Sequence, residues 1–292
     1  MSVEVRYYTD PGCSWSWSSE PVIRRLMVEF GDSLSWTYVM GGLARDYTKD
    51  HEDPDAGIGA GRGGYLGLVA DWLDVADEGR MPIDPRLWVD SPIASTYPAC
   101  MAVKAAAEQA DDGGYRYLRR LREGLMCFRR KLDTTEALVE EARAAKLSVE
   151  RFRVDLGSHA IVEAFGADLE EVRAVPDEAR ADGQVKATGG HERVTFPSIV
   201  MVGDDGERHG VFGFKPYRDY LAAAQNAGAK YAERPPPSVA EALERFGRMA
   251  TAEIEAVCAM PTPRAAAELW RLAGEWQVKP VRVLTGYLWE PA

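Results

Sequence analysis

Cys13 is the residue best placed to do chemistry, and it lies in the segment Asp10-Pro-Gly-Cys-Ser-Trp-Ser-Trp-Ser-Ser-Glu-Pro21. This segment falls between a predicted strand and a predicted helix, so the thiol would face unpaired backbone N–H groups. Those N–H groups and the helix dipole favour thiolate over thiol, which would make Cys13 a nucleophile near neutral pH. Ser16 could donate a hydrogen bond to the thiolate, and Trp15 and Trp17 could offer surfaces to a substrate.

The same four residues also have purely structural interpretations. A free cysteine is often a small buried apolar residue, and serine is common in the first turn of a helix. Tryptophan more often packs than binds a ligand. Ser16 could equally mark a site that has lost its activity.

The remaining cysteines and the histidines suggest no second reactive centre. Cys100 and Cys127 fall in apolar helical patterns, which predicts core packing; Cys100 is the one alternative partner for Cys13. Cys258 is also expected to be buried. The four histidines are scattered; His191 is the one that could reach Cys13 as a base or charge partner, although a solvated loop residue is the preferred interpretation. We therefore expect no disulfide scaffold and no metal site.

The composition excludes several classes of protein. The 292 residues carry 35 Lys+Arg against 46 Asp+Glu, a net charge of −11, which disfavours binding to nucleic acid or to an anionic membrane. The sequence lacks an apolar run of the roughly 18 residues that a membrane helix needs. A cleaved signal of ordinary length would remove Cys13, so we expect a cytoplasmic protein.

The elements that must position Cys13 follow from the periodicity of the apolar residues. Strands are predicted at 3–9, 34–40, 198–202 and 209–212, the last two joined by the hairpin signal Gly203-Asp-Asp-Gly206. Helices are predicted at 19–30, 65–76, 93–109, 115–129, 134–145, 161–171 and 216–226. This order predicts an α/β domain with inserted helices.

Residues 41–64 interrupt the pattern. Gly59-Ala-Gly-Arg-Gly-Gly64 has the spacing of a dinucleotide-binding loop, but a polar run precedes it where a buried strand is required. We expect a flexible lid instead.

The C-terminal part is predicted to form a separate unit. Residues 232–238 contain three consecutive prolines and read as a linker, and residues 239–292 read as three helices and two strands, an order that resembles a winged helix-turn-helix. The third helix has no basic excess, so we expect a docking or dimer-forming module and not a DNA-binding one.

The active-site segment resembles that of DsbA-like thioredoxin-fold proteins, in particular the cytoplasmic FrnE-like branch. Val194-Thr-Phe-Pro-Ser198 is similar to the cis-proline loop of that family, and Tyr97–Ala106 and Glu163–Leu169 are similar to its inserted helical domain. The resemblance covers residues 3–226. It implies a thioredoxin-like fold at 1–60 and 186–231 with a helical insertion at 61–185, whereas the linker at 232–238 and the winged-helix-like module at 239–292 lie beyond it.

The resemblance also implies a site and a reaction. Cys13 and Ser16 would be catalytic, and a cis bond at Pro197 would face Cys13; the implied substrate-binding residues are Ser14, Trp15, Trp17, Thr195, Phe196 and Pro197. Ser16 stands where a dithiol enzyme has its resolving cysteine, so the motif cannot close its own disulfide. A single-cysteine exchange with a disulfide-bearing protein or small-thiol substrate is expected. No tightly bound cofactor is expected, but glutathione or another low-molecular-weight thiol would serve as co-substrate.

Two other functions remain open. Kappa-class glutathione transferases and 2-hydroxychromene-2-carboxylate isomerases resemble this two-part fold but usually carry Ser where this chain has Cys13. Some DsbA-like proteins are non-catalytic protease adaptors, in which the groove would hold a protein partner.

Overall fold

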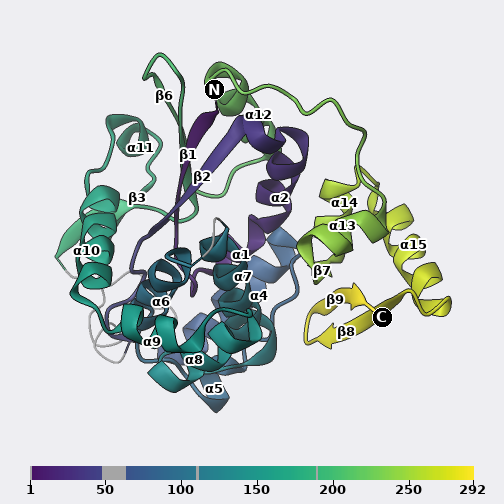
Figure 1. Cartoon of the computed structure of the whole chain (residues 1–292), viewed down its shortest axis with the longest axis horizontal. Helices are drawn as coiled ribbons and strands as arrows, with labels where there is room; N and C mark the ends of the chain where they lie inside the picture. The colour runs from purple at the N-terminus through teal and green to yellow at the C-terminus, as the bar shows by residue number, and fades with distance from the viewer. Residues whose placement is uncertain (1, 48–63, 110–111, 189) are drawn as a thin grey trace.

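A four-stranded mixed sheet lies at the centre of the N-terminal part. The computed structural model describes residues 2–47, 64–109, 112–188 and 190–292 (Figure 1). The strand order is β2-β1-β5-β6, with β1 parallel to β2 and antiparallel to β5. The four strands are β1 (Val3–Thr9), β2 (Leu34–Met40), β5 (Ser198–Val202) and β6 (Arg208–Phe212). All four predicted strands are confirmed, with β6 one residue longer.

The helices next to the sheet are α1 (Ser14–Ser18), α2 (Glu20–Glu29) and α12 (Tyr217–Asn226), and a short η1 (Gly31–Ser33) precedes β2. Ile23 and Leu26 of α2 are fully buried in a core with Tyr7 of β1 and Tyr220 of α12. The predicted helix at 19–30 is α2. The chain already turns helically at Ser14, which the apolar period does not reveal because α1 reads Ser-Trp-Ser-Trp-Ser.

Between β2 and β5 the described chain is mainly helical, as predicted. The helices are α4 (Gly64–Gly79), α5 (Leu87–Asp90), α6 (Tyr97–Ala107), α7 (Gly113–Phe128), α8 (Thr135–Ala144), α9 (Val149–Leu156), α10 (His159–Arg173) and α11 (Asp177–Ala181). The apolar stripe Leu118, Leu121 and Leu125 of α7 is buried in the core of these helices, and Phe128 is partly buried against it. The sequence analysis missed α5, α9 and α11, which are short and therefore show little periodicity. The predicted glycine-rich lid falls largely outside the described residues; Gly64 begins α4.

A second, two-stranded sheet was not predicted. Strands β3 (Val185–Thr188) and β4 (His191–Val194) pair antiparallel just before the Phe196–Pro197 segment. The Gly189-Gly190 pair between two short runs is a hairpin signal that could have revealed them. This hairpin forms one wall of the site described below.

The C-terminal segment has its own small core. It contains α13 (Val239–Phe246), β7 (Met249–Ala250), α14 (Thr251–Val257), α15 (Thr262–Gly274), β8 (Val278–Val283) and β9 (Gly286–Pro291), with strand order β7-β9-β8. The predicted sequence of three helices and two strands is confirmed. Leu243, Ile254, Leu269 and Trp289 are buried together with Val28 of α2, so the core of this segment is completed by the N-terminal part.

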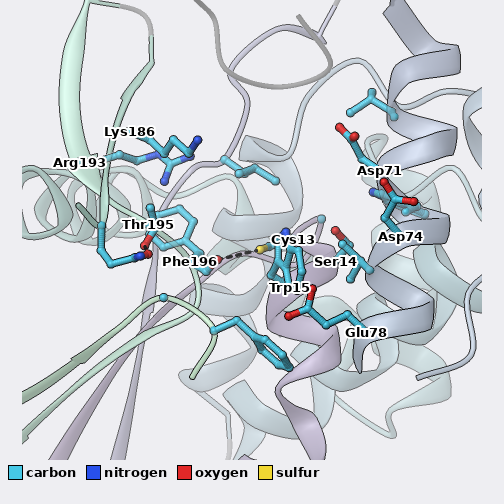
Figure 2. A pocket seen from close by; sticks show the side chains of 18 of the residues that line it. Cys13, Ser14, Trp15, Asp71, Asp74, Glu78, Lys186, Arg193, Thr195 and Phe196 are labelled. Atoms are coloured by element: carbon cyan, nitrogen blue, oxygen red, sulfur yellow. Dashed lines mark hydrogen bonds between the residues drawn. The ribbon is translucent and has the colours of Figure 1, made fainter. Parts of the chain in front are cut away.

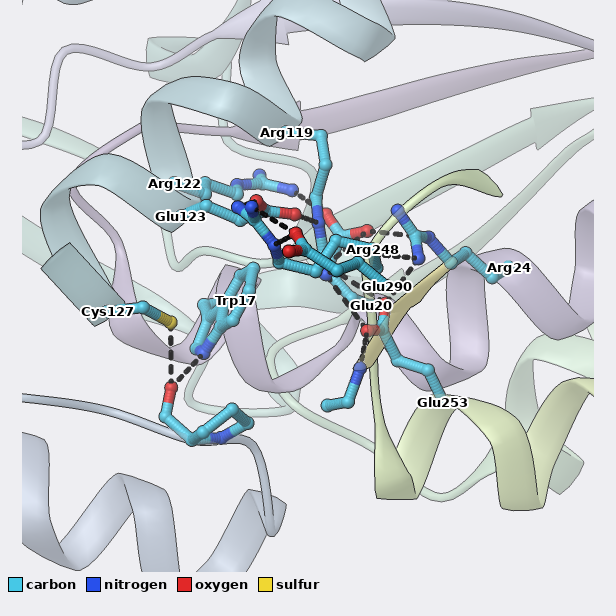
Figure 3. A network of polar contacts seen from close by, with 12 residues as sticks. Trp17, Glu20, Arg24, Arg119, Arg122, Glu123, Cys127, Arg248, Glu253 and Glu290 are labelled. Carbon is cyan, nitrogen blue, oxygen red and sulfur yellow. Dashed lines mark hydrogen bonds and ion pairs between the residues drawn. The ribbon is translucent and has the colours of Figure 1, made fainter. Parts of the chain in front are cut away.

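A buried network of charged residues joins the C-terminal segment to the rest of the chain (Figure 3). Glu253 of α14 accepts two hydrogen bonds of 2.9 Å from Arg119 of α7 and lies 3.1 Å from Arg24 of α2. Glu20 of α2 pairs with Arg119, Arg24 and Arg122, and all of these side chains are nearly inaccessible to solvent. The C-terminal segment thus docks on its own chain, whereas its predicted role in dimer formation stays a prediction.

A second link is made by the tip of the β8–β9 hairpin. Thr285 accepts a 2.7 Å hydrogen bond from the Ile83 N–H and donates one of 3.1 Å to the Ile83 carbonyl.

Within the described part of the chain, no helix combines the length and apolar character needed to cross a membrane.

Candidate active site at Cys13

Cys13 is held by a tight turn between β1 and α1. Its N–H donates to the Asp10 carbonyl at 3.2 Å, and the Asp10 carboxylate accepts from the Gly12 N–H at 2.7 Å. A Cβ on Gly12 would lie 2.7 Å from the Thr96 side chain, so this position requires glycine. Cys13 is the N-cap of α1, and its sulfur accepts from the Ser16 N–H at 3.4 Å. The expected placement of the thiol before a helix is therefore confirmed.

The Phe196–Pro197 segment, which precedes the neighbouring strand β5, faces Cys13. The peptide bond between the two residues is cis, as expected, and the Phe196 carbonyl accepts from the Cys13 Sγ at 3.7 Å. The Phe196 ring fills the space over Gly41, where a Cβ would come within 1.8 Å of the ring. Two segments 183 residues apart in the sequence thus meet at one sulfur atom.

A cavity of about 500 Å³ opens at Cys13, within the size range of small-molecule sites (Figure 2). Its lining includes five of the predicted site residues, namely Cys13, Ser14, Trp15, Thr195 and Phe196. Figure 2 shows Lys186 and Arg193 of the β3–β4 hairpin on one side of Cys13 and three carboxylates of α4 on the other. These carboxylates are Asp71, Asp74 and Glu78.

The protonation of Cys13 differs from the sequence-based expectation. Its side chain is only 4% exposed, and this burial raises the pKa of the thiol. The hydroxyl and N–H of Ser16 and the charge of Arg122 lower the pKa, but they do not offset the burial, and Asp10 raises it further. Helix α1 has only five residues, so few aligned peptide dipoles act on the sulfur. In this conformation Cys13 is a thiol at neutral pH.

Ser16 and Trp17 are both buried, and neither lines the cavity. The Ser16 hydroxyl is buried and has no hydrogen-bond partner among the described residues. Trp17 is fully buried: its indole N–H donates to the Pro82 carbonyl at 3.0 Å, and its ring lies 4.2 Å from the Arg119 guanidinium. The expectation that Trp17 contacts a substrate is therefore corrected, because the turn from Trp15 to Trp17 sends the second indole into the helical core.

Trp15, by contrast, lines the cavity and packs against Phe214, with 5.2 Å between ring centroids. Pro197 does not line the cavity; it precedes β5. His191 is exposed and also lies outside the cavity lining, so the idea that it reaches Cys13 gains no support.

A buried carboxylate lies under the turn. The Asp10 Oδ2 accepts hydrogen bonds from Leu43 N–H at 2.6 Å, Thr96 Oγ1 at 2.9 Å and Cys100 Sγ at 3.2 Å. Burial raises the pKa of Asp10 and, together with the nearby Asp10 carboxylate, that of Cys100. Cys100 thus stabilises the turn. Cys127 donates to the Pro82 carbonyl at 3.2 Å. Both cysteines are buried, as predicted.

Several residues of this site were missed by sequence reasoning. Lys186 and Arg193 lie on the hairpin that was not predicted, and the α4 carboxylates look like an ordinary solvated helix face. Asp10 was seen only as part of a turn. In the described residues no group of three or more His, Cys, Asp or Glu side chains could hold a metal ion.

The fold and the site together define a class. A cysteine at the start of the first helix, facing a cis-proline loop at the edge of a β-α-β and β-hairpin sheet, is the arrangement of a thioredoxin-fold protein. A family model described as thioredoxin matches residues 7–175. The chain belongs to the DsbA-like family of thioredoxin-fold proteins.

Among curated proteins the chain is similar to the ClpXP adapter protein SpxH of Halalkalibacterium halodurans, at 25% identity over 98% of this chain and 88% of that protein. SpxH of Bacillus subtilis is 26% identical over 99% of this chain and 89% of that protein. Among solved structures, the cytosolic disulfide reductase DsbM of Pseudomonas aeruginosa aligns with a TM-score of 0.55 at 17% identity, covering 76% of this chain and 98% of DsbM. At this identity the likeness shows the shared fold.

Proposed function

We propose that this protein is a thiol-disulfide oxidoreductase that acts through Cys13 alone. The observation that carries the proposal is the meeting of the Cys13 sulfur and the Phe196 carbonyl at the floor of a cavity of about 500 Å³. A sulfur in a tight N-cap turn, open to a cavity on one side, can be reached by a disulfide while its own position stays fixed.

The proposed reaction has two exchange steps. The Cys13 thiolate attacks one sulfur of a disulfide R–S–S–R′, forms a Cys13–S–S–R mixed disulfide and releases R′S⁻. An external thiolate R″S⁻ then attacks the sulfur of R, which releases R–S–S–R″ and restores the Cys13 thiolate. One S–S bond forms and one breaks in each step, so no further oxidant or reductant is needed. The Cys13 proton must leave before the first attack because burial favours the thiol.

The roles of the neighbouring residues follow from their positions. In the proposal, the Ser16 hydroxyl, which has no partner in the thiol form, donates to the Cys13 sulfur once it is charged. Ser14, Trp15, Thr195 and Phe196 contact the substrate, and Pro197 sets the course of the loop. The co-substrate is a small thiol, for which the cytoplasm, where such thiols are kept reduced, is the fitting compartment.

The test is a trapping experiment on the reduced protein. Oxidised glutathione should place one glutathione on Cys13, found by peptide mass mapping, and reduced glutathione should remove it. Cys13→Ser should abolish the adduct, while Cys127→Ser, which changes a buried cysteine outside the cavity, should keep it. An unmodified Cys13, or an adduct that maps to another cysteine, would refute the proposal.

A second candidate function is that of a protease adaptor. It is favoured by the similarity to SpxH proteins, which extends over 98% of this chain and includes the C-terminal segment. The burial of the thiol is compatible with a groove that holds a partner without covalent chemistry. The glutathione transferase and isomerase alternative stays a prediction.

The two functions separate in a binding experiment with purified ClpX from the same source. If the protein is an adaptor, calorimetry should show that ClpX binds the wild-type chain and the Cys13→Ser variant equally well. Loss of binding in that variant, or no binding by either, would count against a non-covalent adaptor.

A further inference from the structure

Two cations on the β3–β4 hairpin face the cavity at Cys13, and no carboxylate among the described residues forms an ion pair with either. Lys186 and Arg193 are directly opposite each other in the register of this antiparallel pair. Both line the cavity, and neither forms an ion pair with any residue that the structure describes. Like charges in directly opposite positions on one face destabilise a sheet, so this arrangement needs an explanation.

Arg193 is the more unusual of the two residues. It is only 6% exposed, and its Nε has no hydrogen-bond partner among the described residues. One terminal nitrogen donates to the Val194 carbonyl at 2.9 Å, and the guanidinium lies 4.2 Å from the centre of the Phe196 ring. A buried guanidinium without a counter-ion is costly, and a buried cation is normally paired.

The stack on Phe196 fixes this charge beside the reacting atoms. The Phe196 carbonyl contacts the Cys13 sulfur, and the Phe196 ring contacts Arg193. Phe196 therefore connects the guanidinium to the sulfur of the proposed exchange. Figure 2 shows Arg193 and Lys186 side by side on the wall to the left of Cys13. The planar guanidinium can bind both oxygens of a carboxylate, and the more exposed lysine can close the site from the solvent side.

We propose that Lys186 and Arg193 bind the carboxylate of a small thiol that exchanges with Cys13. This inference rests on the proposed function and narrows its co-substrate to low-molecular-weight thiols that carry a carboxylate near the sulfur. The cavity volume of about 500 Å³ favours such a small molecule over a folded protein surface. The carboxylate supplies a counter-ion that none of the described residues provides through an ion pair.

The experiment uses the full-length protein with Cys13 converted to its mixed disulfide with 2-thiopyridine. Release of the pyridine thione is followed by absorbance with two matched thiols, N-acetylcysteine and N-acetylcysteamine, which differ by one carboxylate. The ratio of the release rates of the two thiols, measured with a small-molecule pyridyl disulfide, gives their intrinsic selectivity. In the wild-type protein we expect the ratio of the release rates to favour N-acetylcysteine about tenfold more than in this reference. An effect of this size corresponds to one good hydrogen bond to a charged group.

The variants separate a carboxylate site from a structural role. Lys186→Gln, at an exposed position that should not affect folding, should lower the selectivity several-fold, and Arg193→Gln should return it toward the reference. Arg193→Lys should retain part of it. Lys230→Gln changes the net charge equally at an exposed lysine outside the cavity and should leave the selectivity unchanged. If Arg193 only supports the fold, its variants should slow both thiols alike.

The outcomes distinguish this inference from the proposed function. Normal exchange at Cys13 with only the intrinsic selectivity would overturn the carboxylate site and leave the oxidoreductase standing. Failure of Cys13 to form any mixed disulfide would overturn both. A third arm compares cysteine peptides that carry Asp or Asn beside the cysteine, and selectivity confined to these peptides would overturn the assignment to a small thiol.

Discussion

At the scale of single residues, the central result is that the surroundings of Cys13 place its sulfur at a cavity but do not ionise it. The N-cap position supplies one N–H at 3.4 Å, and Ser16 can supply a second donor. The near-complete burial of the thiol and the Asp10 carboxylate at the turn oppose these donors, because both raise the pKa of Cys13. Because a charge loses more by desolvation than these weak donors return, the pKa of the thiol rises.

The pH dependence of alkylation tests this balance. Only the thiolate reacts with iodoacetamide, so a pKa above the ordinary value of about 8.5 means that the rate rises through pH 9 and does not level off near pH 7. Cys13 should still react before Cys100 and Cys127, because it alone of the three lines the cavity. Ser16→Ala should move the profile to higher pH, whereas Ser14→Ala should leave it in place. A plateau below pH 8 in the wild-type protein would contradict this prediction.

At the scale of elements, each wall of the site is carried by a different element. Helix α1 holds Cys13, the segment before β5 holds Phe196, α4 brings the carboxylates and the β3–β4 hairpin brings the cations. The sequence analysis located the first two because they carry a local motif. A helix was predicted at 65–76 but not its place at the site, and the hairpin was not predicted, because neither segment shows its partner in its own sequence.

The docking of α14 on α2 and α7 depends on buried charge. Glu253 is the common acceptor for Arg24 and Arg119, and these three side chains are almost inaccessible to solvent. Glu20 remains as a second anion for both arginines, and the arginines around it hold the pKa of Glu20 below its ordinary value. The network is balanced only when α14 is in place.

We therefore expect Glu253→Gln to lower the free energy of unfolding by about 3 to 5 kcal/mol, because it leaves buried arginines short of one negative charge. The measurement is urea unfolding followed by circular dichroism. Glu268→Gln is the matched control: its partner Arg271 lies on the surface of α15, and its loss should cost less than about 1 kcal/mol. Equal losses in the two variants would show that the buried network does not stabilise the docking.

At the scale of the whole molecule, the proline-rich linker does not separate two independent units. The tip of the β8–β9 hairpin is hydrogen-bonded to Ile83, and the neighbouring Pro82 carbonyl accepts from Trp17 of α1. The C-terminal segment therefore reaches the active-site helix by two routes, through α2 and through residues 82–83. The sequence analysis expected a separate module, and the structure shows that its core is shared with α2.

Shared core and buried charge predict that the C-terminal segment and the sheet unfold together. In native-state hydrogen exchange, amides of α14 and of β1 should show the same free energy of opening and the same urea dependence. The β3–β4 hairpin, a two-stranded sheet, should open at a lower free energy. Two separate urea transitions, with α14 exchanging early, would contradict a single cooperative unit.

The sequence by itself determined the features that depend on neighbours along the chain. The strands at 3–9 and 34–40, the turn that places Cys13 before a helix and the order of elements after the linker all follow from local periodicity and turn residues. Ser16 in place of a second cysteine was also visible directly, and in the proposed reaction it restricts the exchange to one thiol.

Only the tertiary structure decided what surrounds that thiol. The burial that raises the pKa of Cys13, the inward turn of Trp17 and the position of Lys186 and Arg193 beside Cys13 all arise from contacts between segments far apart in the sequence. Such contacts leave no periodic signal, because each segment's pattern records which face is apolar and not which segment will cover it. The single cysteine was visible from the start, but the anion-binding wall proposed beside it became apparent only in the folded chain.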